Sequence, residues 1–281
     1  MLAGELQQVS PEIRMTLLTP LQRAWHFREL IRAVVRRELA ARFRGSILGW
    51  LWAIFGPLLM LTIYTFVFSS AIGIRTAASA KGVTNYSLTI FVGLIVFNLF
   101  SEVAYRAPAL LHENANFIKK SIFPSETLAW TATIRAIVYA GISFGVLLVF
   151  ELILVHWLPV TFFLLPLVVF PFVLFLLGVS WFLMALGSFT RDVTHLMASI
   201  VPVFMFATPI FYSVSDAPKG MRIFLRCNII GNYVEMVRDI VLYDILPSPA
   251  LYIGTVLATI LIFRASYRFF MRYKNVFVDV I

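Results

Sequence analysis

Three arginines at every fourth position between residues 28 and 36 are the side chains with the clearest chemistry in this chain. Arg28, Arg32 and Arg36 share one face of a helix, because a spacing of four returns to nearly the same side. Guanidinium groups grip phosphate oxygens through paired hydrogen bonds, so this face can recognise a phosphate-bearing headgroup. It can equally anchor a helix to anionic lipids, and both interpretations stay open.

These arginines need an amphipathic helix to position them, and residues 28–44 have that pattern. Apolar residues such as Ile31, Val34 and Val35 fall on one arc and the arginines on the other. That pattern is typical of a helix lying in the membrane interface. Glu38 falls inside the apolar arc, and Arg42, four residues further on, is its expected partner.

The composition indicates a polytopic integral membrane protein. Apolar residues make up 60% of the 281 residues and charged residues only 13%, against roughly 25% charged in soluble domains. We predict an all-α fold with an N-terminal amphipathic interface helix, six transmembrane helices, and short re-entrant helices before the last span. The predicted spans are 47–72, 86–104, 128–155, 161–189, 194–214 and 250–270, with a polar connection at 105–127 and the re-entrant helices at 215–249.

The distribution of Lys and Arg predicts the orientation in the membrane. Six spans put both termini on one side, and that side carries 17 of these residues against six on the other. The positive-inside rule therefore places both termini in the cytoplasm and 215–249 outside. The opening residues have no apolar stretch typical of a cleavable signal peptide, which agrees with this orientation. Topology thus explains the net charge of +9, and we expect no nucleic-acid partner.

The sequence offers no catalytic or metal-binding constellation. Walker A and HExxH patterns are absent, the four histidines are scattered, and Cys227 is the only cysteine. The charges Glu102, Arg135, Glu151 and Arg264 lie near predicted membrane edges, so the span centres carry none. We expect no enzyme, but a protein that moves something with energy from a partner. The alternative is a membrane-embedded enzyme of glycan or lipid assembly, which needs a carboxylate or metal cluster.

Aromatic residues crowd the first and fifth predicted spans. They can contact lipid, or they can line a path whose walls stack on the apolar faces of sugar rings. The candidates for such a path are Trp50, Trp52, Phe55, Tyr64, Phe68, Phe204, Phe211 and Tyr212. At the start of the first span, Gly45 and Gly49 form a G-x-x-x-G pattern, which permits close helix packing in a membrane.

Four stretches together resemble one family. They are RFRGSILGWLWAIFGPLLMLTIYTFVF at 42–68, NFIKKSIFPSE at 116–126, GSFTRD at 187–192 and ATPIFYS at 207–213. They are similar to the permease subunits of bacterial polysaccharide-export ABC transporters, and among these to the O-antigen export type. Capsule and teichoic-acid exporters, and drug or small-lipid permeases of the same superfamily, are the alternatives. The resemblance runs from about residue 21 to the end, which leaves residues 1–20 as an unassigned N-terminal extension.

The resemblance implies a homodimer in the bacterial inner membrane, with two copies of a separate ATPase subunit that binds ATP and Mg²⁺. This chain would hold no cofactor, and the cargo would be a glycan on undecaprenyl diphosphate. Residues 21–45 would form a cytoplasmic gate helix, and 46–281 the transmembrane domain. The residues implied for the gate and the lipid diphosphate are Arg28, Arg32, Arg36, Glu38, Arg42 and Arg44. Those implied for coupling to the ATPase are Asn116, Phe117, Lys119, Lys120, Phe123, Pro124 and Glu126. Those implied for the outer-mouth helices are Tyr233, Met236 and Arg238.

Overall fold

A computed structural model describes residues 19–42, 44–67, 82–119, 124–154, 159–214 and 217–280, and within these ranges every regular element is helical. The expected residues Phe68, Lys120 and Phe123 and the extension 1–18 lie outside them. The long helices are α3 (Leu51–Phe66), α4 (Gly82–Arg106), α7 (Thr127–Leu154), α8 (Leu165–Phe189), α9 (Asp192–Ala207) and α12 (Pro249–Val280). The other elements are α1 (Thr19–His26), α2 (Arg28–Arg42), η3 (Ala107–Ala109), α5 (Leu110–Glu113), α6 (Ala115–Lys119), η4 (Val160–Leu164), α10 (Lys219–Cys227), α11 (Ile229–Arg238) and η6 (Asp239–Tyr243).

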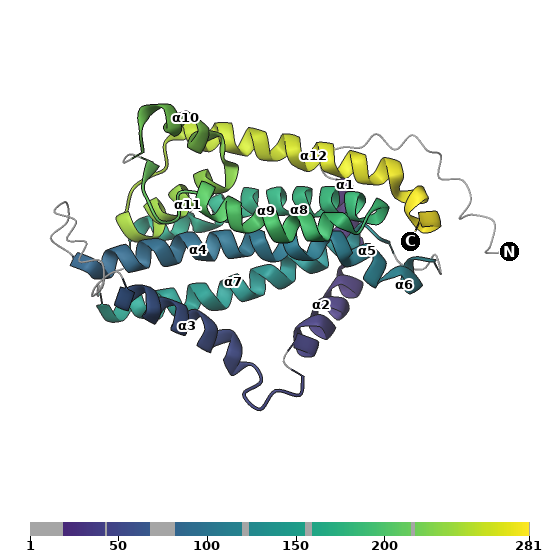
Figure 1. The fold of residues 1–281 in the computed structure, drawn as a ribbon, viewed down its shortest axis with the longest axis horizontal. Helices are drawn as coiled ribbons and strands as arrows, with labels where there is room; N and C mark the ends of the chain where they lie inside the picture. Colours follow the sequence, from purple (N-terminus) through teal and green to yellow (C-terminus); the bar gives the residue numbers. More distant parts are fainter. Residues whose placement is uncertain are drawn as a thin grey trace.

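The elements form one helical bundle with distinct ends (Figure 1). Helices α4, α7, α8, α9 and α12 run roughly side by side. Helices α1, α5 and α6 lie at one end of the bundle, and α10 and α11 at the other. Over its described residues the chain is therefore a helical bundle whose two groups of short helices are separated by the length of the bundle.

Four helical stretches are long and apolar enough to cross a membrane: Tyr86–Glu113, Thr127–Ile153, Val160–Phe189 and Pro249–Phe277. Helices α3 and α9 are also apolar but have only 16 residues each. At 1.5 Å per residue the described residues of each helix span about 24 Å, less than the hydrocarbon core of ~30 Å. The six-span count thus stays a prediction for α3 and α9. Helix α12 has 32 residues, so it is longer than a single crossing requires.

Helix α3 begins later than predicted because two glycines before it have left-handed backbones. Gly45 has φ +83° and Gly49 has φ +50°. Both lie in the connection between α2 and α3, and a Cβ on either would meet nothing within 4 Å. The interpretation of these glycines as a helix-packing motif is therefore wrong. They form a sharp turn that lets α2 and α3 run in different directions (Figure 1).

Replacing both glycines by alanine tests this turn. The backbone conformation would then cost roughly 1 kcal/mol at each position, while no new side-chain clash arises. We expect Gly45→Ala with Gly49→Ala to lower the melting temperature of the purified protein by a few degrees. Gly56→Ala is the control, because Gly56 lies inside α3 with open space around it. Equal melting temperatures for both variants would contradict the turn.

Helix α9 ends at Ala207, well before the predicted end at residue 214. Thr208 is extended, with φ −92° and ψ 136°, because a residue that precedes a proline is pushed out of the helical region. Pro209 therefore stops the helix, while Pro202 is accommodated inside it. The backbone carbonyls of the residues that follow Ala207 therefore need hydrogen-bond donors from other parts of the chain.

The core lies where α4, α8, α11 and α12 meet. Helices α8 and α12 approach closely at Gly178, where a Cβ would stand 3.0 Å from the Cα of Phe263. The buried Trp181 packs on Phe263 and Tyr267, with ring centroids 5.4 and 4.8 Å apart. Most of α4 is buried, whereas only Leu61 is buried on α3. Helix α3 is thus attached to the outside of the bundle.

Candidate functional site

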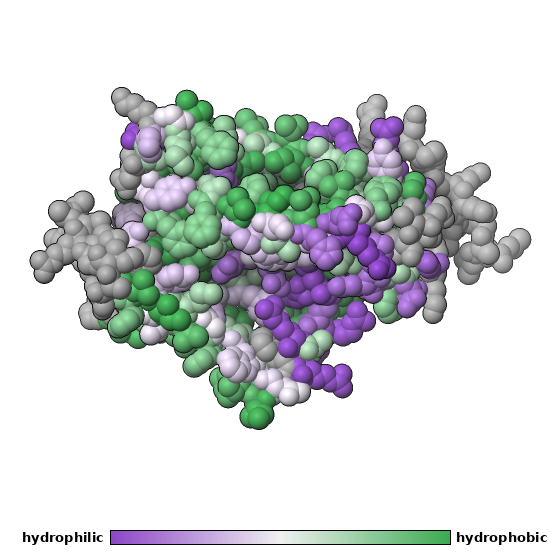
Figure 2. All heavy atoms as spheres, viewed as in Figure 1, coloured by the Kyte–Doolittle hydropathy of each residue, from purple (hydrophilic) through white to green (hydrophobic). Residues whose placement is uncertain are grey.

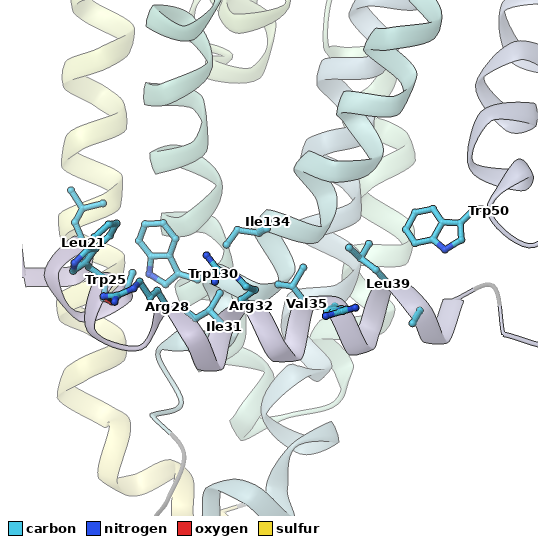
Figure 3. A pocket seen from close by; sticks show the side chains of 13 residues that line it. Leu21, Trp25, Arg28, Ile31, Arg32, Val35, Leu39, Trp50, Trp130 and Ile134 are labelled. Atoms are coloured by element: carbon cyan, nitrogen blue, oxygen red, sulfur yellow. The ribbon is translucent and has the colours of Figure 1, made fainter.

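An apolar pocket of about 810 Å³ lies between α2 and α7. Ile31, Val35 and Leu39 line it from α2, and Trp130 and Ile134 from α7. Figure 3 shows α2 running crosswise to the bundle helices with these side chains turned toward them. The remaining lining residues are Leu21, Ala24, Trp25, Arg28, Arg32, Arg36, Ala40 and Trp50. The structure therefore brings the arginine face and three tryptophans to one cavity.

The arginines of the pocket remain largely available to a ligand. Arg28, Arg32 and Arg36 are exposed, and hydrophilic residues gather over α2 in Figure 2. Glu29 accepts from Arg32 at 3.3 Å and lies 3.6 Å from Arg28, while Arg28 also stacks on Trp25. The exposed Glu29 carboxylate thus pairs with the guanidinium groups of both Arg28 and Arg32. The pocket combines an apolar floor with excess positive charge, which suits an amphiphile with an anionic head.

Four charged side chains join α2 to the bundle beside this pocket. Arg135 of α7 donates to Glu38 of α2 at 3.3 Å and to Glu102 of α4 at 2.9 Å. Arg42 of α2 donates to the same Glu102 at 3.1 Å and lies over the Tyr139 ring. We call Glu38, Arg42, Glu102 and Arg135 the α2 ion cluster. The expected Glu38–Arg42 pair is wrong, because each of these side chains pairs with another helix instead.

The described first part of the predicted coupling region forms the short helix α6 and is partly exposed. On α6, Asn116, Phe117 and Lys119 are exposed, whereas Ile118 is buried. The guanidinium of Arg37 lies 5.8 Å from the centre of the Phe117 ring, so α2 contacts α6 directly. A partner that binds this end of the bundle would therefore touch an element attached to the pocket.

Glu126 anchors the end of the coupling region to both ends of the described chain. Its carboxylate accepts from Arg23 of α1 and Lys274 of α12, each at 2.6 Å, and its side chain is 4% exposed. Trp181 donates its Nε1–H to the Glu126 carbonyl at 3.0 Å. Burial alone raises the pKa of this carboxyl, but Lys274 and Arg23 outweigh it, so the pKa lies below its usual 4.5. The neighbouring Pro124 is partly exposed.

Gly187 lets η3 and α5, which precede α6 in the predicted polar connection 105–127, pack directly on α8. A Cβ on Gly187 would stand 2.6 Å from the Cα of Pro108 in η3. His112 of α5 also contacts the Gly187 carbonyl through Nε2 at 3.0 Å. Gly187 therefore lets the backbones of α8 and η3 touch, and the His112 side chain adds a second contact.

Gly187→Ala should separate these elements. Because the added methyl group would overlap backbone atoms rather than a flexible side chain, we expect a loss of about 2 kcal/mol in stability. The melting temperature measures it. Gly145→Ala on α7 is the control, since its Cβ would meet nothing within 4 Å and alanine favours a helix. A Gly187→Ala protein as stable as this control would contradict the contact.

The described channel aromatics lie on α3 and α9, after the end of α9, and, for Trp50, directly before α3, where Trp50 also lines the pocket. Trp50, Trp52, Phe55 and Phe204 are 43 to 51% exposed. Tyr64, Phe211 and Tyr212 are partly buried. Both helices contact α4. The described residues of a single chain thus direct several of these rings outward, toward lipid or another subunit.

The predicted outer-mouth residues lie inside the bundle. Tyr233 and Met236 are fully buried, and Arg238 is 7% exposed. Tyr233 hydrogen bonds Thr259 of α12 at 2.8 Å. Asn228 caps the start of α11 by accepting from the Gly231 N–H at 3.2 Å. These residues therefore hold α11 in the core rather than forming an open rim.

The structure offers no support for hydrolytic or metal chemistry in its described residues. Residues 141–145 read GISFG and match the G-x-S-x-G pattern of serine hydrolases, but they lie within the continuous helix α7. Ser143 donates to the Tyr139 carbonyl at 3.1 Å, so the strand–turn–helix context of a nucleophile is missing. Across the described ranges, no three His, Cys, Asp or Glu side chains form a possible metal site.

Comparisons with known proteins agree with this membrane architecture. Over 191 residues the chain is 27% identical to "O-antigen export system permease protein RfbA" of Myxococcus xanthus, covering 68% of this chain and 71% of that protein. A protein of the same name from Klebsiella pneumoniae is 24% identical, covering 75% and 80%. The "Polysialic acid transport protein KpsM" of Escherichia coli is 23% identical, covering 75% and 81%.

The family relationship rests on a match over most of the bundle. Residues 29–242, from α2 to η6, match the family described as "ABC-2 type transporter". This range includes the pocket-lining face of α2, the α2 ion cluster and the coupling region. The chain belongs to the ABC-2 type transporter family.

Proposed function

We propose that this chain is the channel-forming permease of an ATP-driven exporter that moves an undecaprenyl-diphosphate-linked polysaccharide, foremost O-antigen, out of the cytoplasm. The family supplies a transporter membrane subunit, and relatives carry the names of O-antigen export permeases. Both termini and the α2 pocket then face the cytoplasm of the bacterial inner membrane, as the excess of Lys and Arg predicts.

The pocket between α2 and α7 is the observation that carries this proposal. Its apolar floor of Ile31, Val35 and Ile134 suits a polyprenyl chain. The arginines at 28, 32 and 36 border that floor and suit a diphosphate. A lipid-linked glycan has both parts, joined at the diphosphate. We therefore assign α2 the role of the gate helix that receives the lipid end of the cargo.

The chain works as a homodimer in this proposal. A single chain exposes Trp52 and Phe55 on α3 and Phe204 on α9, and a second copy would bring two such faces together. Aromatic rings offer flat surfaces on which sugar rings can stack and slide. Two copies of a separate ATPase subunit, which holds ATP and Mg²⁺, bind the α5–α6 region. The contact between Arg37 and Phe117 passes their movement to α2.

Purification from the native membrane tests the proposed partner. The tagged chain is solubilised in mild detergent, and co-purifying proteins are identified by mass spectrometry. We expect a stoichiometric protein with a Walker A motif. A clean preparation without an ATPase would contradict the proposal and favour a stand-alone carrier or a membrane-embedded enzyme.

Capsular polysaccharide is the second candidate cargo, because polysialic acid transport proteins are among the relatives. Both cargoes predict the same architecture and differ in the glycan that reaches the surface. Chemical analysis of the glycan lost from a deletion strain distinguishes them. A drug or small-lipid permease would leave the surface glycan unchanged.

A further inference from the structure

The α2 ion cluster crosslinks the same two helices that form the walls of the pocket. Glu38 precedes the pocket residue Leu39 on α2, and Arg135 follows the pocket residue Ile134 on α7. The Arg135–Glu38 contact thus ties α2 to α7 at the pocket. If α2 moves away from α7, this ion pair must break.

The Arg135–Glu38 pair of this cluster is largely shielded from water, whereas the Arg42 side chain is 48% exposed. The side chains of Arg135 and Glu38 are 10% and 12% exposed, and that of Glu102 is 31% exposed. The Arg135 Nε is buried and makes no hydrogen bond within the described structure. Arg135 therefore depends on its two carboxylates, since charge in an apolar helix is costly without partners.

We propose that Arg135 is a positioning residue that, through Glu38, latches α2 against α7 and so controls the opening of the pocket. Release of Glu38 leaves Arg135 with Glu102 alone, which favours closing again. Arg42 binds the same Glu102 and keeps the end of α2 attached to α4. The inference rests on the proposed gate role of α2, and it adds the side chains that hold the gate shut.

Cysteine labelling measures the latch in the full chain in native membranes. Cys227→Ser removes the only natural cysteine, and Val35→Cys places a thiol of similar size at a pocket position that is 7% exposed. A membrane-permeant maleimide should react slowly with this nearly buried thiol and faster when α2 is lifted. We expect Glu38→Gln to raise the labelling rate about tenfold, since contacting charged residues couple strongly. Glu102→Gln should also raise it, because Arg135 and Arg42 share that carboxylate.

Glu29→Gln is the matched control. It makes the same substitution on α2, but Glu29 is 71% exposed and pairs only on the helix surface, so the labelling rate should stay unchanged. A second reporter, Val234→Cys, lies fully buried on α11 and should stay protected in every variant. Equal labelling for Glu38→Gln and Glu29→Gln would overturn the latch. So would labelling at Val234→Cys that rises together with that at Val35→Cys, because the chain would then be loosening everywhere.

Labelling needs no cargo, so the latch and the proposed function can fail separately. The latch is judged by the labelling rates alone. The proposed function is judged by the surface glycan of the deletion strain.

Discussion

Arg238→Leu is expected to lower the melting temperature by about 10 °C and to reduce the amount of folded protein in the membrane. The Arg238 guanidinium donates to the carbonyls of Thr89, Pro209 and Ile210 at 2.9, 2.7 and 2.5 Å. Pro209 and Ile210 follow the end of α9. Leucine would leave these carbonyls without that donor, at roughly 1 to 3 kcal/mol for each buried group, here the carbonyls of Pro209 and Ile210. Thermal unfolding of the purified protein measures the loss.

Two further variants make this prediction specific. Arg226→Leu removes an exposed arginine of α10 and should leave the melting temperature nearly unchanged. Gly93→Ala should act in the same direction as Arg238→Leu, because its Cβ would stand 2.5 Å from an Nη of Arg238. If Arg238→Leu is as stable as Arg226→Leu, the guanidinium does not hold α4, α9 and α11 together.

Glu126→Gln is expected to lower the melting temperature by about 5 °C at neutral pH. The amide cannot balance Arg23 and Lys274, which both contact this buried carboxylate. Breaking a buried pair costs about 3 to 5 kcal/mol, and the cations lose less here because their side chains are 35% and 30% exposed. Glu113→Gln is the control, since its pair with Arg106 is more exposed and contributes little.

The effect of Glu126→Gln should depend on pH in one direction. Because Arg23 and Lys274 lower the pKa of Glu126 below 4.5 in the folded chain, the stabilisation is complete above pH 4.5. It is lost as the pH falls through the folded pKa. The melting-temperature difference between the natural chain and Glu126→Gln should therefore be constant from pH 5 to 8 and shrink below pH 4.5. A difference that grows on acidification would contradict the pairing of Glu126 with Arg23 and Lys274.

Local pattern predicts the helices of this fold well but not all of their ends. The apolar runs indicate α4, α7, α8 and α12, because each buries or presents apolar side chains over many turns. The late start of α3 depends on left-handed backbones at Gly45 and Gly49, and glycine also occurs inside helices, as Gly56 does. The early end of α9 depends on Thr208 preceding Pro209, while Pro202 leaves the same helix intact.

The site is only partly predictable, because its contacts join distant parts of the chain. The spacing of Arg28, Arg32 and Arg36 already indicates their shared face. A carboxylate in the apolar arc of α2 indicates that Glu38 points inward, but its partner Arg135 lies on α7 and cannot be read from local spacing. Likewise, the apolar stripe of α11 marks a buried face, whereas the carbonyls that bind Arg238 come from α4 and the end of α9.

The most direct test of the central claim is the surface glycan of a strain that lacks this chain. We predict that surface polysaccharide disappears and that undecaprenyl-diphosphate-linked glycan accumulates inside the cell. The natural chain should restore export, whereas a chain with Arg28, Arg32 and Arg36 all changed to Gln should restore little of it. Unchanged surface polysaccharide in the deletion strain would contradict the account.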